Sequence, residues 1–303
     1  MSFPASIDGV AEVSVFEPAG APKGFVLIEV PHGATRRGDY DAVAARMKSR
    51  LPSQLEHFFF VNTDVGAPEG ALWLGPHLAE AGLTVVVVRC LIPRTFIDSN
   101  RVVALSQQGL VVDGLTPAVQ GYVTHPDDVA WLVQQHGRYH GLVKGLYDEV
   151  CGQQQGLALQ LHSFSPRSVG IEKTDEHIVE ALHAAYVPEV YATWPERPPV
   201  DLISATQDGS FRTAPALMDA LQAAYVAAGV PAKQNATYHL HPVTMGYVYA
   251  HAHPGQVLCV ELNRGLICEP FVPFGVSPIA AGPLEQLVRP IAEIISTALL
   301  ARP

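Results

Sequence analysis

Leu159-Gln160-Leu161-His162-Ser163-Phe164-Ser165 contains both a fold signal and a site signal. The apolar run Gly156–Leu161 predicts a buried strand, and His162 stands at its end. Histidine is a common zinc ligand, and a strand end is a rigid place to hold one. A lone histidine there could equally be a core residue with satisfied hydrogen bonds, so the interpretation depends on the other strand ends.

Further runs rich in Val, Ile, Leu and Phe predict strands at Gly24–Val30, His57–Val61, Thr84–Cys90, Val200–Ala205 and Gln256–Leu262. Helix-like stretches lie between them, at Asp39–Leu51, Pro68–Ala81, Asp127–Cys151, Thr174–Tyr186, Thr213–Ala228 and Leu284–Leu300. Gly82 and Gly229 stand where two of these helices should stop. The alternation predicts an α/β fold with helices on both faces of a sheet. Thr95–Gly121 reads as irregular and is a candidate active-site flap.

The bulk composition favours a folded globular protein and disfavours nucleic acid as its main partner. The chain has 303 residues, of which 48% are hydrophobic, enough for one α/β domain over residues 1–303. Lys and Arg total 19 against 29 for Asp and Glu, a net charge of −10. Nucleic-acid binding needs a basic face, so nucleic acid is not expected as a partner. The oligomeric state is left open.

Four cysteines and the N-terminus predict the cellular location. Cys90, Cys151, Cys259 and Cys268 form no Cys-x-x-Cys pair, which favours buried, reduced thiols in a cytoplasmic protein. Residues 1–8 have neither the basic nor the apolar part of a signal peptide. The apolar runs are too short to cross a bilayer, so no membrane association is expected.

Polar residues at three other strand ends complete a possible site. In an open α/β sheet, ligands bind beyond the carboxyl ends of the strands. His32 and Asp64 follow two predicted strands, as His162 follows its own. Two imidazoles and one carboxylate are a recognised catalytic zinc set, with a fourth position open for water. Glu261, on the last strand, could take the water proton and deliver it to a leaving nitrogen.

Each of these residues also has an ordinary structural interpretation. His32 could bind loop backbone, Asp64 could cap a helix or form a turn, and Glu261 could pair with Arg264. There is no His-Glu-x-x-His motif, and Thr35 occupies the third position after His32, where a His-x-x-Glu motif needs glutamate. Spacing alone therefore does not decide between these interpretations.

Six short segments, in this order, carry a family resemblance: Val30-Pro31-His32-Gly33-Ala34, Asn62-Thr63-Asp64-Val65-Gly66-Ala67, Arg94-Thr95-Phe96-Ile97-Asp98-Ser99-Asn100-Arg101, Arg138-Tyr139-His140, Leu161-His162-Ser163 and Val260-Glu261-Leu262-Asn263. Together they resemble the N-formylglutamate amidohydrolase family, part of the wider zinc-carboxypeptidase-like group. The resemblance covers most of the chain. It implies a mixed, mostly parallel sheet of the zinc-carboxypeptidase-like (phosphorylase/hydrolase-like) type.

The resemblance also implies roles for particular residues. His32, Asp64 and His162 would hold one zinc ion, and Glu261 would be the general base. Asn100 and Arg101 would grip the substrate carboxylate, in keeping with the bidentate geometry of a guanidinium, although Arg101 could instead pair with Asp98.

Three further residues have roles that stay open. Arg94 could stabilise the oxyanion or serve in a structural ion pair. Tyr139 and His140 could face the pocket as substrate-binding residues or pack a helix.

Two departures from the family pattern concern the surroundings of the metal. Gln160 and Asn62 stand where relatives carry Asp, at positions that would orient ligands. The pairs His239/His241 and His251/His253 are also unlike the family; a second metal site is conceivable, but pocket lining or ordinary loop roles are favoured. These changes affect the expected substrate more than the expected reaction.

The sequence therefore predicts zinc-dependent hydrolysis of the amide of a small N-acyl amino acid, with N-formyl-L-glutamate as the reference. A metallocarboxypeptidase-like peptidase, or a deacylase of another N-acyl or peptide substrate, would use the same groups. A catalytically inactive small-ligand binding protein is the non-enzyme alternative. A serine hydrolase is disfavoured because there is no Gly-x-Ser-x-Gly elbow.

Overall fold

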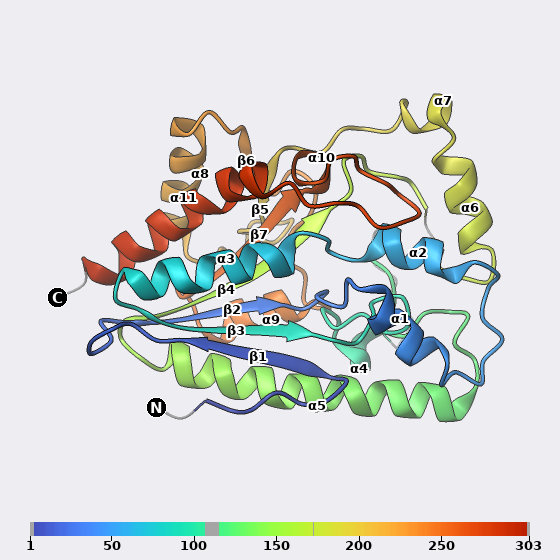
Figure 1. Cartoon of the computed structure of the whole chain (residues 1–303), viewed down its shortest axis with the longest axis horizontal. Coiled ribbons are helices and arrows are strands. Elements are labelled where there is room, and N and C mark those ends of the chain that lie inside the picture. The colour runs from blue at the N-terminus through green and yellow to red at the C-terminus, as the bar shows by residue number, and fades with distance from the viewer. Residues whose placement is uncertain (1–2, 107–114, 172, 302–303) are drawn as a thin grey trace.

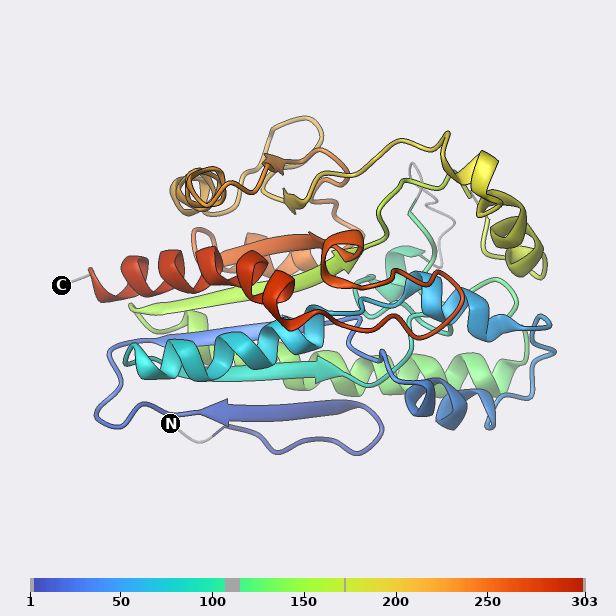
Figure 2. The same ribbon diagram turned by 45° about the horizontal axis from the view of Figure 1, so that its top comes forward.

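The computed structural model describes residues 3–106, 115–171 and 173–301. Within these residues, seven strands form one sheet in the order β1-β3-β2-β4-β7-β5-β6 (Figures 1 and 2). The strands are β1 Ala11–Phe16, β2 Phe25–Val30, β3 Thr84–Cys90, β4 Gly156–Phe164, β5 Val200–Leu202, β6 Ala232–Gln234 and β7 Val257–Asn263. The central strands β3, β2, β4 and β7 are parallel, whereas β1 pairs antiparallel with β3 and β5 with β7. The predicted mixed, mostly parallel sheet is confirmed.

Helices cover both faces of the sheet. They are α1 Arg37–Ala44, α2 Leu55–Asn62, α3 Ala67–Glu80, α4 Val103–Ser106, α5 Pro126–Cys151, α6 Ile178–Ala185, α7 Pro188–Tyr191, α8 Pro215–Ala227, α9 Met245–Ala252, α10 Arg264–Ile267 and α11 Ala281–Leu300. The long helix α5 lies along one face, and α3 and α11 lie on the other (Figure 1). Gly82 and Gly229 have positive φ just after α3 and α8, where the sequence predicts helix stops.

Alternate side chains of the central strands enter two separate cores. On β2, Leu27 packs in the core that contains α5, whereas Val26 and Ile28 pack with α3 and α11. On β4, Ala158 and Leu159 divide in the same way. This is the period-two alternation of a strand that is covered on both faces, and it explains the nearly continuous apolar runs in the sequence.

Residues 57–61 were expected to form a strand, and this prediction is wrong: they belong to helix α2. Short apolar runs do not distinguish a strand from a buried helix. Here Leu55, Phe58 and Phe59 are spaced at i, i+3 and i+4, and all three are buried, so a helix buries them on one face. Strands β1 and β6 were not predicted, because both lie at sheet edges and carry polar residues.

The predicted flap Thr95–Gly121 lies partly outside the described residues, which exclude 107–114. Its described parts contain the short helix α4 and an isolated bridge between Ile97 and Val119. The two described ends of this segment contact the site described below.

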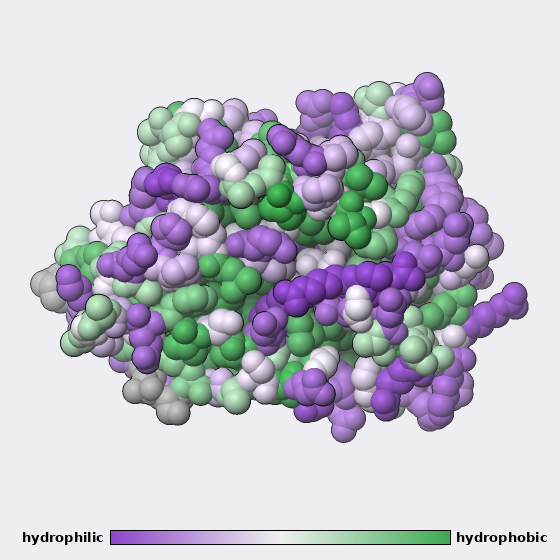
Figure 3. Space-filling model, viewed as in Figure 1, coloured by the Kyte–Doolittle hydropathy of each residue, from purple (hydrophilic) through white to green (hydrophobic). Residues whose placement is uncertain are grey.

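The surface in Figure 3 mixes hydrophilic and hydrophobic residues. Exposed apolar side chains such as Leu72, Leu266 and Val276 belong to different segments, which is common for folded proteins. No helix in the described part of the chain is long and apolar enough to cross a membrane. All four cysteines are buried and unpaired.

Candidate metal centre and active site

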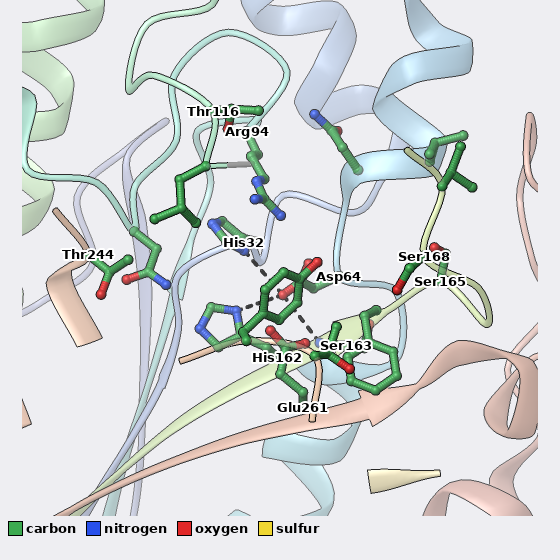
Figure 4. A pocket seen from close by; sticks show the side chains of 18 of the residues that line it. His32, Asp64, Arg94, Thr116, His162, Ser163, Ser165, Ser168, Thr244 and Glu261 are labelled. Atoms are coloured by element: carbon green, nitrogen blue, oxygen red, sulfur yellow. Dashed lines mark hydrogen bonds and ion pairs between the residues drawn. The ribbon is translucent and has the colours of Figure 1, made fainter. Parts of the chain in front are cut away.

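The predicted ligands converge where the parallel strands end (Figure 4). His32 follows β2, His162 is the third residue from the end of β4, and Asp64 follows α2. The Nδ1 atoms of His32 and His162 lie 3.2 Å and 2.9 Å from Asp64 Oδ2. All three side chains are buried. The Asp64 carboxylate therefore reaches the site from the end of helix α2, and not from the end of a strand as the sequence predicts.

A tight chain reversal places Asp64. Gly66 has φ of 91°, and a Cβ at this position would collide with the side chain of Ile267, so only glycine fits here. The buried guanidinium of Arg264 donates to the carbonyl oxygens of Phe60, Val61 and Thr63, at the end of α2. Arg264 therefore satisfies helix-terminal carbonyls rather than pairing with Glu261.

The other nitrogen of His32 is held by a carboxylate. Its Nε2 lies 2.8 Å from Oδ1 of Asp98, which is fully buried. The second oxygen of Asp98 lies 3.0 Å from Arg94 Nε and 3.5 Å from Arg101 Nη2. Burial alone would raise the pKa of Asp98, but Arg101, Arg94 and His32 hold it well below its usual value. Asp98 is thus an ionised support for His32, a role that sequence reasoning missed.

The other nitrogen of His162 is held by an amide. Its Nε2 lies 3.2 Å from Oε1 of Gln160, two residues back on the same face of β4. Gln160 Nε2 in turn donates to Glu29 Oε2, at 3.0 Å. Gln160 therefore occupies the supporting position that the sequence predicted for it. Asn62 instead accepts a hydrogen bond from Thr95 Oγ1 and lines the cavity.

Glu261 lies beside this set, on β7. In the sheet register it pairs with His162, and it lines the same cavity. Burial raises the pKa of Glu261 to about 7; His162, Arg197 and Arg94 act against this and Asp64 adds to it. A carboxyl with a pKa near neutrality can both accept and return a proton, as a general base requires.

The predicted substrate-binding residues Asn100 and Arg101 and the predicted oxyanion group Arg94 line the same cavity, of about 450 Å³. The Asn100 amide oxygen accepts from Gly246 N at 3.0 Å, so its amide nitrogen is the group available as a donor. Both arginines also contact Asp98, so the ion pairs considered as structural alternatives are present as well. Arg101 also donates from Nε to the Thr116 carbonyl oxygen and from Nη1 to that of Asn100. A guanidinium has five N–H donors, so these contacts aim each arginine and still leave donors for a ligand.

Tyr139 and His140 lie behind the site rather than in the described cavity wall. The Tyr139 hydroxyl donates to Glu29 Oε1. His140 contacts the Ser99 carbonyl oxygen at 2.7 Å, and His136 contacts that of Arg101 at 3.0 Å. His140 and His136 therefore contact the loop that carries Asp98 and Arg101, which is the helix-packing role that the sequence left open for His140. Tyr139 instead contacts Glu29 on β2.

Arg197 also lines the cavity and was not among the predicted site residues. It lies in the Pro-rich connection before β5, and its guanidinium sits over the rings of Phe164 and Tyr238, at 5.2 Å and 5.3 Å. Its Nε donates to Ser168 Oγ. Its Nη1 donates to the Ser165 carbonyl oxygen at 3.5 Å. Within the described residues, no carboxylate forms an ion pair with Arg197, in contrast to Arg94 and Arg101.

His32, Asp64 and His162 form the one group of three or more metal-type side chains found in the described chain, with ligand atoms within 4.8 Å of one another. The donor chemistry fits a metal ion, since the two imidazoles turn the same nitrogen inward and use the other on a fixed partner. Of the four late histidines, His239 lines the cavity, His251 stacks on Tyr247 and His253 contacts Asp148.

No family model and no curated protein matches this chain. Among solved structures, a gene product of Agrobacterium tumefaciens is similar, with 17% identity, 95% coverage of both chains and a TM-score of 0.52. An N-formylglutamate amidohydrolase from Ralstonia eutropha has 18% identity, covers 95% of this chain and 96% of its own, and gives a TM-score of 0.48. At such identities, the likeness to the Agrobacterium protein shows the fold alone.

Proposed function

We propose that the protein is a zinc-dependent hydrolase that cleaves the amide of a small N-acyl amino acid. The observation that carries this proposal is the convergence of His32, Asp64 and His162 beside Glu261, in one cavity. Two imidazoles and a carboxylate are a donor set typical of catalytic zinc. A binding protein without activity would not need a carboxyl of raised pKa beside such a set.

The roles of the side chains follow from their positions. A bound zinc ion would supply a Lewis acid and make water more acidic. Glu261 removes a proton from the attacking water and returns it to the departing nitrogen, which gives a carboxylate and a free amine. The guanidinium of Arg94 faces the cavity and stabilises negative charge that develops on the carbonyl oxygen. Asn100 and Arg101 hold the α-carboxylate of the substrate.

The finer proposal is an N-formyl-L-glutamate-like substrate with a second carboxylate. The support is Arg197, a cavity arginine that has no carboxylate ion-pair partner in the described residues. Phe164 and Tyr238 hold its guanidinium in place, and Ser168 Oγ accepts from its Nε. Its Nη1 donates to the Ser165 carbonyl oxygen in a long contact of 3.5 Å, so Nη2 is the nitrogen available for an anion. An analogue with a neutral side chain would leave this partly buried cation without a carboxylate contact.

The test of the reaction is Glu261→Gln, compared with wild-type protein of measured zinc content. The variant should keep its zinc and lose turnover by about 100-fold or more, the range for general base catalysis. Asp128→Asn, which changes a buried carboxylate at the start of α5 to an amide, is the matched control. Full activity of Glu261→Gln would remove Glu261 from the mechanism.

A substrate panel tests the finer proposal. N-formyl, N-acetyl and longer N-acyl derivatives of glutamate and glutamine, together with dipeptides, separate a deformylase from another deacylase and from a peptidase. Wild-type kcat/KM should favour glutamate over glutamine, and Arg197→Gln should remove that preference. An equal loss on both substrates would assign Arg197 a structural role. Turnover of none of these, with zinc bound, would favour the binding-protein alternative.

A further inference from the structure

Glu29 is a buried carboxyl group that the proposed reaction does not use. It lies in β2, within the apolar run Phe25–Val30, and is fully buried. No cation pairs with it in the described residues. Three groups donate to it instead: Tyr139 Oη to Oε1 at 2.9 Å, Tyr147 Oη to Oε2 at 2.9 Å and Gln160 Nε2 to Oε2 at 3.0 Å. A core does not need such a carboxyl for packing, because an apolar side chain would avoid the desolvation.

The chemistry of these donors fixes the orientation of the Gln160 amide. All three groups donate to Glu29, so the NH₂ group of Gln160 faces Glu29 and its carbonyl oxygen faces His162. Burial raises the pKa of Glu29, and the hydrogen bonds from Gln160, Tyr147 and Tyr139 act against this because they favour the carboxylate form. Gly246 leaves room for that oxygen, since a Cβ at residue 246 would lie 2.6 Å from Gln160 Oε1. The amide is thereby held in one of its two possible orientations.

The orientation of the amide in turn fixes the proton on His162. An amide oxygen accepts only, so Nε2 of His162 must carry its hydrogen, and Nδ1 presents a lone pair. Nδ1 is the atom that faces Asp64. A reversed amide would place NH₂ against Nε2, which would shift the hydrogen to Nδ1 and block it as a ligand.

We propose that Glu29 is a positioning residue that acts through Gln160 to hold His162 in its metal-binding tautomer. The proposal rests on the metal site of the proposed function, but not on its reaction. The proposal also explains why residue 160 can be Gln where relatives carry Asp. The carboxylate of Glu29 does not touch the His162 ring itself but acts on it through the Gln160 amide. Tyr139 and Tyr147 then serve to hold Glu29 in place.

Glu29→Gln tests the proposal with a near-isosteric change. Glutamine at residue 29 can offer either its oxygen or its NH₂ to Gln160, so the amide is no longer held one way round. We expect about 10-fold weaker zinc binding, the lower end for loss of an outer partner of a ligand, measured by competition with a chelator. In metal-free protein, ¹⁵N spectra of labelled histidine should show the Nε2–H tautomer of His162 in the wild type and a mixture in Glu29→Gln. Asp128→Asn is the control for loss of a buried carboxylate and should change neither measurement.

A swap of the two groups separates relay from simple packing. Glu29→Gln combined with Gln160→Glu keeps one carboxylate and one amide in the same space, with the carboxylate now against His162. We expect its zinc affinity to return to within about 3-fold of the wild type, although Gln160→Glu alone puts two carboxyls in contact and destabilises the fold. A double variant that binds zinc more weakly than Glu29→Gln, or a Glu29→Gln protein with wild-type zinc affinity and tautomer, would overturn the proposal. Neither zinc affinity nor the His162 tautomer depends on turnover, and the tautomer is measured in metal-free protein. The experiment therefore tests the role of Glu29 even if the proposed reaction proves wrong.

Discussion

His32 and His162 present the same nitrogen to the proposed metal but are supported in different ways. His32 is backed directly by Asp98, whose charge is balanced by Arg94 and Arg101. His162 is backed by the neutral Gln160, and a carboxyl follows only behind it, at Glu29. A carboxylate partner raises the basicity of a ligand ring, whereas an amide mainly fixes its orientation. His32 is therefore the ligand whose partner raises its basicity, and His162 is the ligand whose partner fixes its orientation.

The most direct way to break the comparison is to remove each ring. His32→Ala and His162→Ala should both lose zinc. Structural zinc sites with four protein ligands bind the ion with about 10–16 kcal/mol, which is roughly 3 kcal/mol for each ligand. Loss of one ligand should therefore weaken zinc affinity by more than about 100-fold. Elemental analysis of each purified variant measures this. Near-stoichiometric zinc in either protein would show that the ring is not a ligand.

Asp98→Asn should have the next largest effect. It removes the charge behind His32 and leaves Arg94 and Arg101 without their shared carboxylate. We expect zinc binding to weaken by up to about 100-fold, and the folded state to lose about 3 kcal/mol or more. Chelator competition and denaturant unfolding measure the two effects. The comparison fails if Asp98→Asn weakens zinc binding no more than Glu29→Gln does.

The sequence predicts the parts of this comparison that depend on single segments. The strands that hold His162 and Glu261, and the strand that precedes His32, are readable because each is a mostly apolar run that is buried on both faces. The run at residues 57–61 was misread because a five-residue apolar stretch fits a helix as well as a strand. Asp64 still reaches the site, because the position of its carboxylate depends on the turn at Gly66 rather than on the type of the preceding element.

The supports of the ligands could not be predicted from the sequence in the same way. Asp98 lies 66 residues from His32, and Glu29 lies 131 residues from Gln160. Glu29 is hidden within an apolar strand, where a single acidic residue gives no pattern. Arg197 stands in a Pro-rich loop, and its position over Phe164 and Tyr238 depends on tertiary packing. Such contacts follow from the assembled sheet rather than from local spacing.

Asp64, the third proposed ligand, extends the comparison, because its support from Arg264 is a set of hydrogen bonds to the backbone next to it. Arg264→Met removes the guanidinium that binds three carbonyl oxygens at the end of α2. Buried carbonyls left without donors should lower the free energy of unfolding by about 2 kcal/mol or more, with a weakening of zinc binding smaller than that of Asp98→Asn. Denaturant unfolding of the metal-free protein and chelator competition test this. If Arg264→Met weakens zinc binding as much as Asp98→Asn does, then Asp64 depends on Arg264 as strongly as His32 depends on Asp98.

The smallest expected effect is a shift in pH dependence on the His162 side of the site, where Glu261 lies. A general base must be ionised, so kcat/KM should fall as the pH drops below the pKa of Glu261. Burial raises that pKa to about 7, and a bound cation lowers it, so the acid limb should lie at or below about pH 7.

Arg197 favours the ionised form of Glu261. Arg197→Gln should therefore move the limb to higher pH on a glutamine substrate, whose neutral side chain makes no ion pair with Arg197 that the substitution would remove. Asp128→Asn should leave the limb in place, and a limb that moves to lower pH in Arg197→Gln would contradict the assignment of Glu261 as the base.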